Sequence, residues 1–210
     1  MANEEHLTRL IEAIERNDIS VWNNWRQKQS YLMPDLSEAD LSGINLINAD
    51  LSGTNLVNAD LSGTNLINTN LSNANLRKAK LSGAYMMGAD LHGANLRDAY
   101  LAKVDLREAN LSGTSLAFAD LSGANLINTN LSNADMRKAK LHGAQLNKAD
   151  PSEADLRAAD LLYIRGLVPF QIKSAENWGS AFYNEEIIEI LGLKPDHNES
   201  LRKDLENNAL

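Results

Sequence analysis

The stretch ADLSGTNLVNADLSGTNL, residues 49–66, carries a leucine at every fifth position. Neither an α-helix, with a period of 3.6, nor a strand, with a period of 2, repeats in this way. When leucine is taken as the centre of each five residues, the pattern runs from Leu36 to Leu161 in 26 consecutive units, and 23 of them have Leu at the centre. Two residues before the centre, 18 of the 26 units carry Ala. Each unit therefore supplies one large and one small apolar side chain to a shared interior.

The other three positions of each unit are polar. Asp or Asn precedes the centre, Ser or Arg often follows it, and Gly or Asn fills the last position in 15 of 26 units. Gly and Asn accept a positive φ most readily, so the last position predicts a corner. A short extended segment followed by a tight turn must coil about an axis if every leucine is to stay inside. The sequence therefore predicts a solenoid with one wall per unit.

The tandem A-(D/N)-L-x-x motif of residues 34–163 resembles the pentapeptide-repeat family. The resemblance implies an all-β solenoid, a right-handed quadrilateral β-helix in which four pentapeptides form one 20-residue coil. Coils about 4.8 Å apart would then stack into a rod roughly 31 Å long. A leucine-rich horseshoe also has repeats of similar length, but its unevenly spaced L-x-x-L-x-L motif does not match.

An internal duplication supports four walls per coil. Residues 61–84 recur at 121–144, identical at 20 of 24 positions and offset by 60. Sixty residues are three whole coils of 20, so each side chain returns to its original wall. Pro151, which replaces a central Leu, removes a backbone N–H, and we expect the coil around residues 148–155 to be loosened there.

The two ends, residues 1–33 and 164–210, lack the repeat and are expected to form α-helical caps over the open ends of the solenoid. Near the N-terminus, an amphipathic stripe predicts one helix and the spacing of two tryptophans predicts a second. Near the C-terminus, we expect a helix that begins at a proline, then a second apolar stripe, then a short helix with two leucines. The N-terminal stripe consists of Leu7, Leu10, Ile11 and Ile14, and the two tryptophans are Trp22 and Trp25. At the C-terminal end, the proline is Pro169, the second stripe consists of Tyr183, Ile187, Ile190 and Leu191, and the two leucines of the last helix are Leu201 and Leu205.

The C-terminal cap contains IKSAENWGSAFY, residues 172–183, which resembles the cyanobacterial branch of the family. This cap is larger than one end needs. A homodimer contact through it is the alternative to a simple cap.

Composition limits the class of protein. The chain has no cysteine and no apolar run long enough to cross a bilayer, and its acidic N-terminus lacks a signal-type core, so we expect a cytoplasmic protein. A net charge of −8 argues against direct binding of nucleic acid or of anionic membranes.

No catalytic, cofactor or metal site is predicted. His92 and His142 are two and a half coils apart, on opposite walls, and His6 and His197 are expected to be surface residues of the caps. The many aspartates before the centres recur because the repeat recurs, and neither a Walker loop nor a dinucleotide-binding G-x-G-x-x-G occurs. The chain is therefore not expected to be an enzyme, and turnover of a carbohydrate or metabolite is the weakest alternative.

Sorting the residues by the 20-residue period reveals two rows of side chains that point outward. One wall carries an arginine row flanked by lysines of two RKAK copies, and the opposite wall carries an apolar row interrupted by Arg107. The arginine row is either a solvated stripe or a contact surface for a protein partner. The apolar row is either a set of β-branched residues tolerated at strand positions or such a contact surface. The candidate protein-binding residues are Arg77, Arg97, Arg137 and Arg157 in the first row and Ile47, Ile67, Met87 and Ile127 in the second.

The leading functional hypothesis is a non-catalytic scaffold that presents these rows to a protein partner of unknown identity. The family resemblance also implies an alternative, because some members mimic duplex DNA, bind DNA gyrase and protect it from quinolones. Such a mimic needs a strongly negative rod. Residues 34–163 contain 15 acidic and 11 basic side chains, a net of only −4, and the arginine row lies among them, so charge disfavours this alternative.

Overall fold

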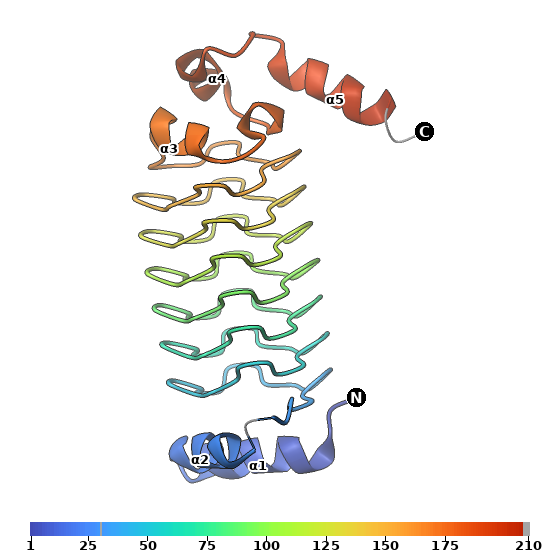
Figure 1. The fold of residues 1–210 in the computed structure, drawn as a ribbon, viewed down its shortest axis with the longest axis vertical. Helices are drawn as coiled ribbons and strands as arrows, with labels where there is room; N and C mark the ends of the chain where they lie inside the picture. Colours follow the sequence, from blue (N-terminus) through green and yellow to red (C-terminus); the bar gives the residue numbers. More distant parts are fainter. Residues whose placement is uncertain (30, 208–210) are drawn as a thin grey trace.

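The computed structural model describes residues 1–29 and 31–207 and shows a rod of stacked coils with helices at both ends (Figure 1). At the N-terminal end lie α1 (Glu4–Glu15) and α2 (Ser20–Lys28). At the C-terminal end lie α3 (Pro169–Ser174), the 3-10 helix η1 (Trp178–Ser180), α4 (Glu185–Leu191) and α5 (His197–Asn207). Helices therefore occur in both segments where the sequence predicts them, and α3 begins at Pro169 as expected.

The coils pair in parallel with an offset of 20 residues, from Asp35↔Asn55 through to Gln145↔Arg165. The paired residue is always the one before the centre, and turns separate it from the next pair, so the walls contain isolated bridges rather than long strands. The last residue of every unit has φ between 54° and 69°, whether it is Gly, Asn or another residue. The four corners per coil that the sequence predicts are therefore left-handed turn positions.

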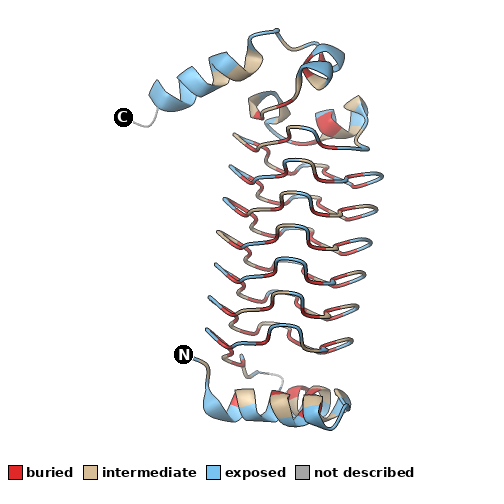
Figure 2. Cartoon of the chain, turned by 180° about the vertical axis from the view of Figure 1, so that it is seen from behind, coloured by how far each residue is buried: buried red, intermediate tan, exposed pale blue. Residues whose placement is uncertain are grey.

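The repeat's apolar positions form the buried interior of the rod, and buried positions recur in every coil (Figure 2). The Leu and Met centres are at most 3% exposed, and the alanines two residues earlier are equally covered along most of the rod. Where Thr replaces Ala, four of the five hydroxyls are hydrogen-bonded; Thr64 Oγ1, for example, donates to the Leu41 carbonyl at 2.7 Å and Thr69 Oγ1 to the Leu46 carbonyl at 2.8 Å. These buried hydroxyls are satisfied within the core, and the exception is Thr54 Oγ1, which is buried without a hydrogen-bond partner.

The recurring Asp or Asn, which precedes the centre in 20 of the 26 units, stabilises the turn that follows. Its side-chain oxygen accepts the backbone N–H two residues later, as Asp40 Oδ1 does from Ser42 at 3.1 Å and Asn70 Oδ1 from Ser72 at 3.0 Å. This is the local hydrogen bond for which Asp and Asn are favoured in turns. The repeated carboxylates are therefore part of the scaffold.

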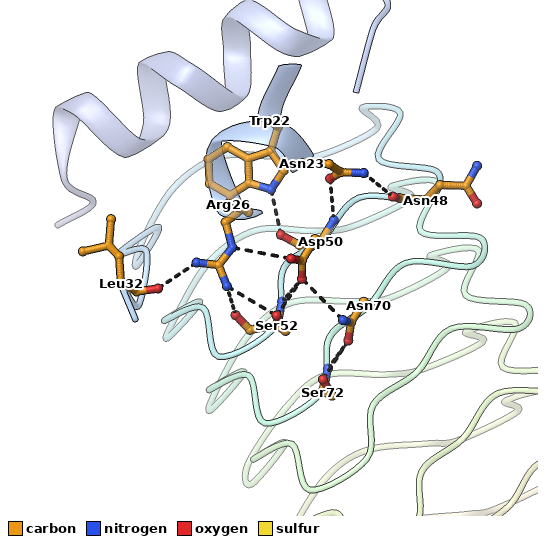
Figure 3. A network of polar contacts seen from close by, with 9 residues as sticks. All are labelled: Trp22, Asn23, Arg26, Leu32, Asn48, Asp50, Ser52, Asn70 and Ser72. Atoms are coloured by element: carbon orange, nitrogen blue, oxygen red, sulfur yellow. Dashed lines mark hydrogen bonds and ion pairs between the residues drawn. The ribbon is translucent and has the colours of Figure 1, made fainter. Parts of the chain in front are cut away.

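The N-terminal cap supplies side chains in place of a preceding coil (Figure 3). Trp22 Nε1 donates to the Asp50 carbonyl at 2.7 Å, and Asn23 accepts from the Asp50 N–H at 2.8 Å and donates to the Asn48 carbonyl at 2.9 Å. The guanidinium of Arg26, a buried residue, donates to the carbonyls of Leu32 at 2.7 Å and Ser52 at 2.6 Å. Backbone groups at the first coil's open edge are satisfied in this way.

The prediction that His6 is a surface residue is wrong. His6 is only 8% exposed, and its Nδ1 accepts the backbone N–H of Asp35 at 3.0 Å. His197 is half-buried, and its Nε2 lies 2.8 Å from the Ala181 carbonyl. Both histidines bond backbone groups near an end of the rod, because the last coils leave such groups without the partners that a further coil would supply.

The parallel bridges between successive coils, which we call rungs, continue past residue 163 into the segment that the sequence predicts to be the C-terminal cap. Asp155 bridges Glu176 and Asp160 bridges Phe182. Ala175 and Ala181 are buried in the alanine position of these rungs, and Tyr183 is fully buried where a central Leu would lie. Since Tyr183 belongs to a rung, α4 begins only at Glu185, and its buried residues are Ile188 and Leu191, whereas the predicted Ile190 is 55% exposed.

The expected loosening at Pro151 is not supported by the pairing. In the preceding coil, the N–H of Leu131 donates to the Asp150 carbonyl at 2.8 Å. At Pro151, the corresponding backbone nitrogen faces the next turn of the chain, where residues form α3 and no bridge to a further coil exists on that wall in the described residues. Proline is tolerated at such an edge because no ladder hydrogen bond is lost there.

We expect Arg26→Ala to lower the free energy of unfolding by about 3 kcal/mol, because the carbonyls of Leu32 and Ser52, which are partly buried, lose a charged hydrogen-bond donor and the buried stem of Arg26 is removed. Urea denaturation followed by tryptophan fluorescence would measure this, since Trp22 and Trp25 lie in the same cap. The matched control is Arg16→Ala, at an exposed position of the cap, which should change stability by less than about 0.5 kcal/mol. Equal stability of the two variants would contradict the assigned role of Arg26.

Acid should destabilise the rod through its turn carboxylates. Hydrogen bonds from the Ser42 hydroxyl and backbone hold the pKa of Asp40 below its ordinary value, and those from Ser62 and Lys80 do the same to the pKa of Asp60. A carboxyl with a lowered folded-state pKa stabilises the protein above its unfolded pKa, about 3.9, and this contribution is lost as the pH falls through the folded pKa.

The variant Asp40→Asn tests this effect, because Asn occupies the same position at Asn45 and keeps the accepting oxygen. We expect the difference in melting temperature between wild type and variant to shrink as the pH is lowered from 6 to 2.5. A difference that is independent of pH would show that the carboxylate charge does not stabilise the turn.

Candidate protein-binding surfaces

The four predicted arginines lie along one wall of the rod. Bridges Asn75↔Asn95, Asn95↔Ser115, Ser115↔Asp135 and Asp135↔Asp155 stack their units directly over one another, with Ala117 in the remaining place. The arginine side chains are 43–55% exposed. We call the outward positions of these five units the ladder face: residues 75, 77, 78, 95, 97, 98, 115, 117, 118, 135, 137, 138, 155, 157 and 158.

Ion pairs hold these arginines in place. Arg137 Nε lies 2.7 Å from Asp135 Oδ1, and Arg157 Nε lies 3.0 Å from Asp155 Oδ1. Arg77 and Arg97 approach the carboxylate of Asp98 at 3.8 and 3.6 Å. The hydrogen bond from Arg137 is the main cause that lowers the pKa of Asp135. The carboxyl of Asp135 is therefore held in its ionised form beside Arg137.

Phe118 occupies the corner beside Ala117 and was not predicted as a site residue. Its φ is 63°, a left-handed conformation that costs a residue with a side chain roughly 1–2 kcal/mol. Its ring is 42% exposed, and Arg97 Cζ and Lys138 Nζ lie 4.7 and 5.3 Å from the ring centroid. The available signal in the sequence was an aromatic residue in a position that mostly holds Gly or Asn.

A groove of about 590 Å³ separates the ladder face from α5. The rod contributes basic side chains and the ring of Phe118, and α5 contributes Leu201, Asp204 and Leu205. None of the α5 residues is buried, and the helix extends sideways beyond the outline of the coils (Figure 1). The basic residues that line the groove are Arg97, Arg137, Lys138 and Arg157.

The predicted apolar row is less accessible than the ladder face. Ile47, Ile67, Met87 and Ile127 are all half-buried. Ile47 also lines a small cavity of about 110 Å³ together with Ile14 and Ile19 of the N-terminal cap. The interrupting Arg107 is bound to Asp105 by its Nε at 2.8 Å. The structure thus keeps this row together on one wall but partly covers it.

The histidines of the coils are far from any metal-binding arrangement. His92 lies on the wall of the Asp90↔Asn110 bridge, where its Nδ1 is 3.0 Å from Ser112 Oγ. His142 lies on the wall of Lys140↔Asp160 and packs against Tyr163 with ring centroids 5.1 Å apart. Within residues 1–29 and 31–207, no three His, Asp or Glu side chains are grouped as metal ligands would be. No helix in this described part is both long and apolar enough to cross a membrane.

Two solved structures of pentapeptide repeat proteins share more than 30% sequence identity with this chain. HetL, a pentapeptide repeat protein involved in heterocyst differentiation regulation in Nostoc sp. PCC 7120, is 37% identical over 63% of this chain and 65% of its own chain, with a TM-score of 0.36. A protein from the Arabidopsis thaliana thylakoid lumen is 32% identical over 59% of this chain and 68% of its own, with a TM-score of 0.24. No curated protein sequence matches the chain.

The fold also resembles that of trypsin-treated QnrB1, a plasmid-mediated fluoroquinolone resistance protein, which is 21% identical over 75% of this chain and 83% of its own, with a TM-score of 0.57. The family model for pentapeptide repeats matches in overlapping segments that together span residues 35–164. These matches cover more than half of the sequence and coincide with the coils. The chain belongs to the pentapeptide-repeat family.

Proposed function

We propose that this protein is a non-catalytic interaction scaffold, a right-handed quadrilateral β-helix that presents rows of side chains to a protein partner in the cytoplasm. The observation that carries the proposal is the filled core, in which the Leu and Met centres are at most 3% exposed. A rod without room in its interior can act only through its outer surface. Stacked coils hold the side chains of that surface at a fixed spacing of about 4.8 Å.

Exposure favours the ladder face over the apolar row as the contact surface. Three of the four ladder arginines are exposed and only Arg97 is half-buried, whereas all four residues of the apolar row are half-buried and Ile47 lines a cavity with residues of the N-terminal cap. Arginine and exposed aromatic residues are also the residue types enriched in protein interfaces. We therefore rank the ladder face first and keep the apolar row as the second candidate surface.

A DNA gyrase regulator is the second candidate function, supported by the similarity of fold to QnrB1 over 75% of this chain. The ladder face weakens this candidate, because it carries six basic and three acidic side chains where a mimic of duplex DNA needs negative charge. A supercoiling assay with and without a quinolone separates the two functions. Inhibition or protection at micromolar protein would favour the regulator.

A homodimer through the C-terminal cap is a further proposal about partners. Val168, Phe170 and Ile190 in this cap are 54%, 81% and 55% exposed. Apolar side chains so exposed can pair with a second copy. The molar mass in solution, measured by light scattering, decides between monomer and dimer, and a monomer at high micromolar concentration would exclude this contact.

The scaffold proposal predicts that protein partners are captured through an outward row. Affinity purification from native lysate would compare wild type with two multiple variants, one with Arg77, Arg97, Arg137 and Arg157 changed to Gln and one with Ile47, Ile67 and Ile127 changed to Asp. We expect the arginine variant to lose the captured partners at least tenfold in abundance. The control changes Ser62, Ser82 and Ser122, on another wall, to Asp. Partners unchanged in both row variants would overturn the proposal for these surfaces.

A further inference from the structure

Phe118 is one of two aromatic residues at the corners of the rod, and the other is Tyr163. Both have the left-handed conformation that every corner adopts, with φ 63° and 57°, and their rings are 42% and 62% exposed. Phe118 differs from Tyr163 in its neighbours, because Arg97 Cζ and Lys138 Nζ lie 4.7 and 5.3 Å from its ring centroid and the ring lines the groove beside α5. An exposed aromatic ring among cationic side chains is a suitable anchor for a protein contact.

Apolar side chains lie on both sides of the groove beside Phe118, next to the basic side chains of the rod and Asp204 of α5. Leu201 and Leu205, one helical turn apart on α5, face the rod across a space of about 590 Å³. On the rod, Phe118 and Ala158 line the same space. Packed protein interiors leave few voids larger than a water molecule, and a space of this size is typical of ligand-binding grooves. The groove is therefore large enough for side chains of another segment.

The charge of this surface is opposite to that of the molecule. The ladder face carries six basic and three acidic side chains, a net of +3, in a chain of net −8, so the remainder of the chain carries −11. A short acidic segment is attracted to such an isolated basic surface. A long polyanion such as nucleic acid would also meet the negative remainder, and its binding requires a wide cationic surface.

We propose that the groove between the ladder face and α5 binds an acidic segment of a partner protein, with Phe118 as the anchor for an apolar side chain of that segment. The carboxylates would pair with Arg137, Lys138 and Arg157, and the apolar side chain would fill the space between Phe118 and Leu201. This inference rests on the proposed scaffold function and names the surface and the chemistry of the partner. Binding would also bring α5, which has no buried residue in the free protein, into contact with the occupant.

Matched variants isolate the two features of the groove. Phe118→Asn removes the ring but keeps a residue that accepts the left-handed corner, so the melting temperature should not fall. Arg137→Gln removes a groove arginine. Its control is Arg107→Gln, because Arg107 binds Asp105 as Arg137 binds Asp135, with Nε–Oδ1 distances of 2.8 and 2.7 Å and side chains 46% and 45% exposed.

The experiment selects random twelve-residue peptides from a display library on the full-length wild-type protein and measures the affinity of the enriched peptides by fluorescence anisotropy. We expect these peptides to combine Asp or Glu with a large apolar residue. Phe118→Asn and Arg137→Gln should each weaken binding at least tenfold, and Arg107→Gln less than twofold. Bound peptide should also slow hydrogen exchange in α5.

Three results would overturn the inference: no enriched peptide, enriched peptides without acidic residues, or affinities that Phe118→Asn leaves unchanged. Displacement of the peptide by a single-stranded oligonucleotide or by phosphatidylglycerol vesicles at equal charge concentration would assign the groove to another class of partner. If lysate partners are lost only in the Ile47, Ile67 and Ile127 variant, this inference fails while the scaffold proposal stands. If peptides bind as predicted but the lysate yields no partner, the groove's affinity for acidic segments is supported and the scaffold proposal fails.

Discussion

The hydrogen bonds between successive coils are the interaction on which the rest of the structure depends. Each central N–H donates to a carbonyl of the next coil, as Leu96 does to Ser115 at 2.7 Å, and the following paired residue returns a bond. This ladder is satisfied only if all units have the same shape. The corners must therefore be left-handed even where the side chain is Lys, Glu or Phe, and the small and large apolar residues must alternate inside. Local strain at such corners is outweighed by the core and the ladder, which are built from every unit.

The same ladder leaves polar groups exposed at both ends of the rod, and the caps satisfy them with side chains that imitate a coil. At the N-terminal end, His6, Trp22 and Asn23 bond backbone groups of Asp35 and Asp50. At the C-terminal end, Asn198 bonds both the N–H and the carbonyl of Tyr183, at 3.2 and 2.7 Å, and Gln171 Nε2 bonds the Ala149 carbonyl at 2.8 Å. The caps therefore continue the pairing of the rod and also end it, which protects edges that would otherwise associate with other chains.

Sequence predicts the rod well because each residue type meets the same environment many times. The period places the core leucines, the corners and both outward rows, and the structure brings Arg77, Arg97, Arg137 and Arg157 together as the period requires. The caps are unique, and here sequence failed: His6 was assigned to the surface, and the stripe containing Ile190 was placed out of register because Tyr183 belongs to a rung. Phe118 was missed for a related reason, since its importance depends on the distant α5 and the period carries no information about that contact.

The internal duplication shows how position along the rod gives similar sequences different roles. Residues 61–84 and 121–144 are identical at 20 of 24 positions, and their offset of three coils puts Arg77 and Lys78 on the same wall as Arg137 and Lys138. Of the two copies, only the second lies next to the groove, where its Arg137 and Lys138 line the space together with Arg97 and Arg157. Arg77 instead shares Asp98 with Arg97 on the open part of the wall. A repeat can therefore be copied without disturbing the core, while the cap determines which copy lines a groove.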